Sequence, residues 1–132
     1  MDGQKKTVLV TEDEPAMLRI LVDKLQESGF ETLQATNGEE GLHLALSHHP
    51  NLVLMDILMP KMDGMAMMDA LRKDEWGKTV PIIALTNVSA DTDETLQAIV
   101  KNQPTYYFVK SNIKLEEVVE KIKEVFSPAA TV

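Results

Sequence analysis

Short runs of apolar residues alternate with longer segments of helical periodicity along this chain, and that alternation most constrains its fold. The runs are continuous rather than alternately polar, which is typical of strands that are covered on both faces. Four runs are clear and a weaker one extends from Thr32 to Thr36; the clear runs are Val8–Val10, Leu52–Met55, Ile82–Leu85 and Tyr107–Val109. Strands separated by helices predict βαβ units and a parallel sheet with right-handed crossovers.

Apolar spacing and capping residues indicate helices between the strands. From Leu115 to Phe126, apolar residues recur at helical spacing, with Glu and Lys side chains on the opposite face. Pro15 suits the first turn of a helix and Gly29 suits its end. Asn37 and Asp63 suit N-caps of two further helices. We therefore predict an α/β fold, a doubly wound five-stranded parallel sheet flanked by five helices.

The length of the chain fits one domain. With 132 residues, 44% of them hydrophobic, the chain can form one folded core. We expect a flexible N-terminal arm over residues 1–6, the folded domain over 7–126 and a flexible tail over 127–132.

Composition narrows the class of function and the compartment. The chain has no cysteine, which excludes disulfides and thiolate metal ligands and agrees with a cytoplasmic location. Its formal net charge of −8 opposes binding to nucleic acid phosphates and to anionic lipids. Because no apolar run reaches the length of a signal peptide or a membrane span, we expect no membrane association.

Acidic, hydroxyl and amino side chains follow the predicted strands at the point where each strand ends. Glu12 and Asp13 follow the first strand, and Asp56 follows the third. Thr86 follows the fourth strand and Lys110 the fifth. Since ligands bind beyond the carboxyl ends of parallel strands, we expect these side chains to share one site.

Clustered carboxylates need a compensating positive charge. Two carboxylates about 4 Å apart repel by roughly 4 kcal/mol at an effective dielectric constant of about 20. Mg²⁺, a hard cation that prefers oxygen ligands, meets this need. Together with the ammonium of Lys110 and the hydroxyl of Thr86, such a metal suits a phosphoryl group, and a carboxylate can act as the nucleophile that forms an acyl phosphate.

Four motifs, in order, resemble those of bacterial two-component response-regulator receiver domains of the chemotaxis-regulator type. The segment Val8–Pro15 resembles the first strand with its acidic pair, and Leu54–Gly64 resembles the phosphorylation strand with its following loop. Ile82–Thr86 resembles the fourth strand with its switch hydroxyl, and Tyr107–Lys110 the fifth strand with its lysine. The similarity covers residues 7–126 and implies a flavodoxin-like fold.

The resemblance implies which residues hold the metal and receive the phosphoryl group. In the family pattern Asp56 is the phosphoacceptor and also a ligand of Mg²⁺. Asp13 binds Mg²⁺ directly, Glu12 binds it directly or through water, and the backbone carbonyl of Leu58 is a further ligand.

The resemblance also implies how the signal is passed on. Thr86 and Lys110 contact phosphoryl oxygens, and Tyr107 changes rotamer as Thr86 moves inward, although Tyr107 can equally be a core aromatic. A sensor histidine kinase or phosphotransfer protein donates the phosphoryl group, and an output partner, which the sequence does not name, reads the switch. The resemblance is also compatible with a dimer that forms on phosphorylation. The only catalysis expected is the protein's own phosphorylation and autodephosphorylation.

Two functions from other classes stay open. A small Mg²⁺-dependent phosphohydrolase with an aspartyl-phosphate intermediate would use the same carboxylates, but the haloacid dehalogenase class has a second aspartate where this chain has Leu58. A flavin-binding electron carrier needs a phosphate loop rich in Ser, Thr or Gly after the first strand. The carboxylates of Glu12 and Asp13 would repel a phosphate at that place.

The sequence departs from the family pattern directly after the lysine. Ser111 stands where the family usually has a proline that follows a cis peptide bond. A cis bond costs about 2.5–4 kcal/mol before other residues, against about 0.5–1 kcal/mol before proline. We therefore expect the chain after Lys110 to run differently from the family pattern.

Overall fold

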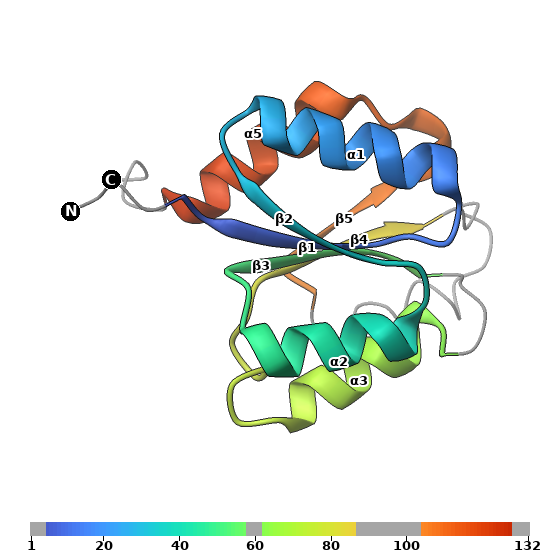
Figure 1. The fold of residues 1–132 in the computed structure, drawn as a ribbon, viewed down its shortest axis with the longest axis vertical. Coiled ribbons are helices and arrows are strands. Elements are labelled where there is room, and N and C mark those ends of the chain that lie inside the picture. Colours follow the sequence, from blue (N-terminus) through green and yellow to red (C-terminus); the bar gives the residue numbers. More distant parts are fainter. Residues whose placement is uncertain (1–4, 58–61, 87–103, 128–132) are drawn as a thin grey trace.

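Five strands form a single parallel sheet in the computed structural model, which describes residues 5–57, 62–86 and 104–127. The strand order is β2-β1-β3-β4-β5, so the chain starts on the inner strand β1, passes to the edge strand β2, and then crosses through β3 and β4 to the other edge strand, β5 (Figure 1). The strands are β1 (Thr7–Thr11), β2 (Glu31–Ala35), β3 (Leu52–Asp56), β4 (Ile82–Thr86) and β5 (Tyr106–Val109). The predicted α/β fold with a five-stranded parallel sheet is confirmed.

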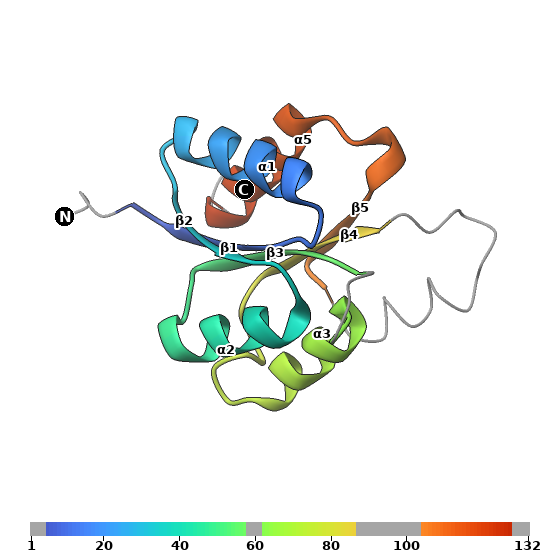
Figure 2. The ribbon, with the colours of Figure 1, turned by 45° about the vertical axis from the view of Figure 1, so that its right-hand side comes forward.

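Helices cover both faces of this sheet. They are α1 (Pro15–Glu27), α2 (Gly38–His48), α3 (Gly64–Lys73) and α5 (Leu115–Phe126). Helices α1 and α5 lie on one face and α2 and α3 on the other, as two views show (Figures 1 and 2). Of the five helices predicted, four lie in the described part of the chain, and the remaining one falls on residues 87–103, outside it.

Capping explains where the second helix begins and why β2 ends one residue earlier than predicted. The side chain of Asn37 accepts a hydrogen bond from the backbone N–H of Glu40 at 2.8 Å, which is the predicted N-cap. The backbone N–H of Thr36 donates to the carboxylate of Glu40 at 2.7 Å. Because its N–H is committed to this helix start, Thr36 leaves the strand pattern, and β2 covers Glu31–Ala35.

The core consists of two clusters, one on each face of the sheet. Under α1 and α5, residues such as Val10, Leu54 and Ile83 form one cluster. The other lies under α2 and α3 and includes three fully buried methionines, Met55, Met67 and Met68. The continuous apolar runs of β1, β3 and β4 therefore contribute side chains to the core on both faces, as expected for a sheet covered on both sides.

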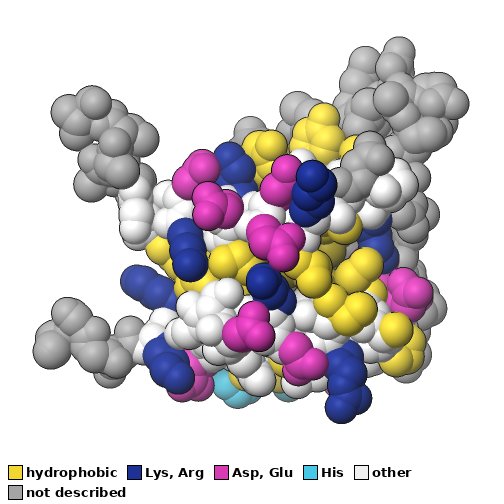
Figure 3. Space-filling model, turned by 90° about the horizontal axis from the view of Figure 1, so that it is seen from above, with side chains coloured by type: hydrophobic (Ala, Val, Ile, Leu, Met, Phe, Trp, Pro, Cys, Tyr) yellow, Lys and Arg dark blue, Asp and Glu magenta, His cyan; other side chains and the backbone are white. Residues whose placement is uncertain are grey.

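The outer surface of the α1 and α5 layer carries acidic and basic side chains interspersed around apolar ones (Figure 3). Lys24 on α1 lies 3.8 Å from Glu116 on α5 and 3.7 Å from Glu27 on its own helix. These pairs are solvent-exposed on the acidic side, so they add little to stability. No helix in the described ranges is both long enough and apolar enough to span a bilayer.

The chain after β5 turns directly into one turn of 3₁₀-helix, Lys110–Asn112. No peptide bond among the described residues is cis, so Ser111 follows Lys110 through a trans bond. The N–H of Ile113 donates to the carbonyl of Lys110 at 3.3 Å and closes this turn. Lys110 is therefore anchored by a tight backbone turn at the end of the sheet.

Candidate functional site

The register of the sheet brings the expected side chains to one edge. Thr11 at the end of β1 pairs with Met55, and Asp56 at the end of β3 pairs with Leu85 on β4. Thr86, the last residue of β4, pairs with Val109 on β5. Glu12 and Lys110 each follow a paired strand end, so both come beside Asp56. Parallel strands in register thus carry polar residues from distant parts of the sequence to the same place.

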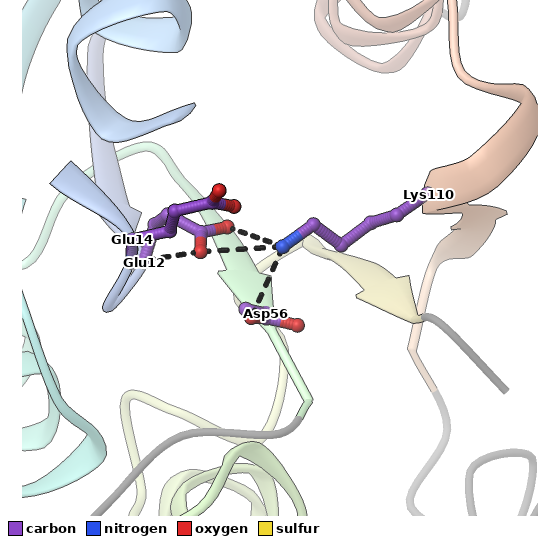
Figure 4. Close-up of polar contacts among 4 residues, drawn as sticks. All are labelled: Glu12, Glu14, Asp56 and Lys110. Carbon is purple, nitrogen blue, oxygen red and sulfur yellow. Dashed lines mark hydrogen bonds and ion pairs between the residues drawn. The ribbon is translucent and has the colours of Figure 1, made fainter. Parts of the chain in front are cut away.

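The centre of the site is a buried cluster of two carboxylates and one ammonium (Figure 4). The Nζ of Lys110 lies 3.1 and 3.2 Å from the two carboxylate oxygens of Glu12 and 3.3 Å from Oδ2 of Asp56. The exposed fractions of these side chains are 0% for Glu12, 5% for Asp56 and 8% for Lys110. Burial of this kind strengthens each charge interaction, because little water screens it.

Burial and neighbouring charge shift the ionisation of the cluster. Removal from water, followed by the charge of Asp56, raises the pKa of Glu12 above 4.5, although Lys110 and the backbone N–H of Glu14 act in the opposite direction. Burial alone would lower the pKa of Lys110, but its hydrogen bond to Glu12 and the charges of both carboxylates outweigh that effect and raise it. Lys110 is therefore held in its charged form.

Three carboxylates of the site could hold a metal ion. Glu12, Asp13 and Asp56 each offer an oxygen, and these oxygens lie within 4.8 Å of one another. Asp13 is exposed, whereas Glu12 and Asp56 are buried. A donor set made only of oxygen, with one member open to solvent, fits a hard divalent cation that keeps part of its water shell. These residues therefore fit Mg²⁺ in ligand type and in spacing.

The other predicted site residues differ in how far the structure describes them. Thr86 is fully buried at the end of β4, on the same edge as Asp56. Tyr107 is 38% exposed on β5, so its interpretation as a core aromatic is wrong. Leu58, expected to offer a backbone carbonyl, lies outside the described residues.

Two features of the site were not predicted from the sequence. Lys110 was expected to contact a phosphoryl group and Glu12 a metal, but in the structure they bind each other across 98 residues. The hydroxyl of Thr11 is fully buried beside Gly41 and has no hydrogen-bond partner among the described residues. In the sequence, the only sign of this buried hydroxyl is that Thr11 is a polar residue at the end of an apolar run.

Comparison with known protein families identifies this arrangement. A model described as the response regulator receiver domain matches residues 8–123. Among solved structures, the chemotaxis response regulator CheY4 of Vibrio cholerae superposes with a TM-score of 0.83 at 25% identity, covering 92% of this chain and 99% of that chain. The family match, residues 8–123, includes β1 from its second residue, the other four strands and the cluster at their carboxyl ends.

Curated relatives agree with that family. The chain is 42% identical over 90 residues to the probable transcriptional regulator ycf27 of Porphyridium aerugineum, covering 68% of this chain and 36% of that protein. It is 37% identical over 89 residues to the polar-differentiation response regulator DivK of Brucella ovis, covering 67% of this chain and 72% of DivK. The aligned region is thus little more than a third of ycf27 but most of DivK.

Proposed function

The chain belongs to the response regulator receiver family of two-component systems, and on that premise we propose that it is a switch operated by phosphorylation of Asp56. A phosphohistidine on a sensor kinase or phosphotransfer protein is the donor. The phosphorylated and unphosphorylated states differ in their affinity for an output partner. The comparisons do not support the alternative of a small phosphohydrolase.

One observation carries the assignment of Asp56. Its carboxylate ends the buried strand β3 and lies 3.3 Å from the Nζ of Lys110, which also neutralises Glu12. A nucleophile needs a lone pair aimed at its substrate and a positive environment for the incoming negative charge. Asp56 meets the second need, because Lys110 supplies one positive charge beside it and a cation held by the neighbouring acids would supply another.

The proposed reaction transfers one phosphoryl group. An oxygen of Asp56 forms a bond to phosphorus while the bond from phosphorus to the imidazole nitrogen of the donor breaks, and that imidazole keeps the electron pair and takes a proton. Lys110 stabilises the phosphoryl oxygens electrostatically, and the hydroxyl of Thr86 donates a hydrogen bond to one of them. Hydrolysis of the acyl phosphate returns the carboxylate and releases inorganic phosphate.

A divalent cation completes the proposed site. Asp13 and Asp56 would hold Mg²⁺, with Glu12 as a direct or water-mediated partner, and the family pattern adds the carbonyl of Leu58. When bound, the metal neutralises charge on the phosphoryl oxygens. Asp13 is the solvent-exposed member of this ligand set, whereas Glu12 and Asp56 are buried.

The proposed output rests on residues that sense the phosphoryl group. Thr86 moves toward it, and Tyr107 on the neighbouring strand changes rotamer in response, which alters the surface near β5 and α5. Such a change is a population shift between two states that phosphoryl contacts bias. The switch is proposed to act through protein partners in the cytoplasm, with a phosphorylation-dependent dimer as one form of output.

The proposed organisation is one receiver domain over residues 7–126, flanked by residues 1–6 and 127–132. The chain spans little more than a third of its ycf27 relative. In a regulator of that length, the output function would lie outside the aligned receiver region. We propose that this domain turns over no external substrate beyond the phosphodonor that charges Asp56.

Phosphorylation by a small donor tests the proposal. The protein is incubated with potassium phosphoramidate and Mg²⁺, and the phosphorylated fraction is followed on a phosphate-affinity gel and by intact mass. We expect addition of one phosphoryl group, lost in Asp56→Asn and retained in Asp74→Asn, which alters an acid remote from the site. Phosphorylation that survives Asp56→Asn, or none in the parent protein, would refute the assignment.

A further inference from the structure

The N-terminus of α3 packs directly against the backbone of Asp56. The N–H of Gly64 donates to the carbonyl of Ile57 at 2.7 Å. A Cβ atom on residue 64 would clash with the carbonyl oxygen of Asp56 and would lie 2.6 Å from the Cα of Ile57. Gly64 is not in the left-handed region of φ, so space rather than backbone conformation demands glycine here.

The backbone of Asp56 is also held from its other side. The N–H of Ile57 donates to the carbonyl of Leu85 on β4 at 2.9 Å, and Asp56 pairs with Leu85 in the sheet. The main chain at the candidate phosphoacceptor is therefore fixed between a strand and a helix terminus. If a side chain is added at position 64, either this main chain or helix α3 has to move.

Packing and capping hold helix α3 against the sheet. Its side chains Met67, Met68 and Leu71 are fully buried against the sheet. Its first turn is capped by Asp63, whose side chain accepts a hydrogen bond from the N–H of Ala66 at 2.9 Å. Because interiors are close-packed, moving the helix outward would break these contacts together. A side chain at position 64 therefore displaces the backbone of residues 56 and 57.

We propose that Gly64 is a positioning residue for phosphoryl transfer, acting through the backbone of Asp56. The inference rests on the proposed function of Asp56 as phosphoacceptor. Displacing this backbone moves the carboxylate relative to Lys110, now 3.3 Å away, and relative to Glu12 and Asp13. A misplacement of about 1 Å at a reacting group can cost about 10²-fold in rate, so a shift of part of an ångström is measurable.

Gly77, in the turn that follows α3, provides a matched control because it packs against the C-terminal end of that helix. A Cβ atom on Gly77 would clash with the carbonyl oxygen of Leu71, again a backbone atom. Gly77 is also buried, and its φ is also outside the left-handed region. The two alanine variants therefore impose the same kind of strain on α3, but only the one at position 64 presses on Asp56.

The experiment compares the parent protein with Gly64→Ala and Gly77→Ala, at a temperature where circular dichroism shows all three folded. Phosphorylation by phosphoramidate with Mg²⁺ gives the rate, and the ¹⁹F NMR spectrum of bound beryllofluoride reports the environment of the Asp56 carboxylate. We expect Gly64→Ala to be slowed about tenfold or more with shifted ¹⁹F resonances, and Gly77→Ala to keep the rate and spectrum of the parent. A Gly64→Ala protein with the parental rate and spectrum would overturn the inference.

A second pair of variants covers the case in which Gly64→Ala does not fold. Asp63→Ala removes the cap that fixes the first turn of α3, whereas Asp74→Ala removes hydrogen bonds to the N–H groups of Trp76 and Gly77 at the other end. We expect phosphorylation to slow about threefold in the first variant only. Equal rates in both variants overturn the inference. Failure of the parent to accept a phosphoryl group instead refutes the proposed function on which the inference rests.

Discussion

Replacing Lys110 with methionine removes the only positive charge that contacts two buried carboxylates in the described structure. In the parent protein, Nζ of Lys110 lies within 3.3 Å of Glu12 and of Asp56, and none of the three side chains is more than 8% exposed. Methionine keeps most of the volume of the lysine stem but cannot neutralise either acid. We expect a large loss of stability in metal-free buffer, because two adjacent buried carboxylates lose the ammonium that contacts both of them.

The size of the loss is set by the lowest-energy way in which the variant can relieve the repulsion between Glu12 and Asp56. Burial and the charge of Asp56 already raise the pKa of Glu12, so protonation of Glu12 relieves the repulsion. Keeping a carboxyl of ordinary pKa 4.5 protonated at pH 7 costs about 2.5 pH units at about 1.36 kcal/mol each, or about 3.4 kcal/mol. Breaking a buried ion pair typically costs about 3–5 kcal/mol. We therefore expect the free energy of unfolding to fall by about 3 kcal/mol.

The same reasoning sets the sign of the pH dependence. In the variant, folded Glu12 binds a proton at a higher pH than it does in the unfolded chain, so the folded state holds more protons between those two pKa values. Stability then rises as pH falls from 7 toward 4.5, and the deficit relative to the parent should narrow over that window. In the parent, Lys110 contributes stability below its ordinary pKa of 10.5, and this is lost as pH rises through its raised folded value.

Urea unfolding followed by far-ultraviolet circular dichroism, in EDTA, measures the effect. Lys78→Met is the matched control, because Lys78 lies closer to its partner Glu75, at 2.9 Å, but the two side chains are 56% and 83% exposed. We expect that control to lose less than about 1 kcal/mol. If Lys110→Met lost no more than the control, burial would not govern the energetics of this cluster, and the reasoning would fail.

Three further predictions concern the metal and the packing. Millimolar Mg²⁺ should raise the melting temperature of the parent by relieving carboxylate repulsion, and Asp13→Asn should erase that rise; an unchanged parental melt contradicts the metal site. Thr11→Val should raise the free energy of unfolding, measured in urea, by about 1 kcal/mol, because the hydroxyl that it removes is buried and has no partner in the described ranges; a loss would mean that the hydroxyl is hydrogen-bonded. Arg72→Met should lower the free energy of unfolding by about 2 kcal/mol, because the carbonyls of Gly77 and Val80 lose charged donors at 2.7 and 2.8 Å; a loss near zero would show that this loop holds without them.

The sequence by itself determined the fold class and the location of the candidate site. Continuous apolar runs and helical spacing are local signals, so β3, β4 and α5 could be assigned within a residue or so. Parallel strands place all their carboxyl ends on one edge, which made the meeting of Asp56, Thr86 and Lys110 predictable. The caps at Asn37 and Asp63 were equally local, since each depends on a hydrogen bond to a residue three positions later.

Only the tertiary structure decided which of these side chains bind one another. Lys110 engages both oxygens of Glu12, and the glycine at position 64 packs on the backbone of Asp56 rather than merely starting a helix. Tyr107 lies at the surface, although its neighbours in sequence are apolar. Distances between residues far apart in the chain depend on strand register and on how closely helices approach the sheet. Strand register and helix-to-sheet distance are set by packing over the whole core, so no short stretch of sequence predicts them.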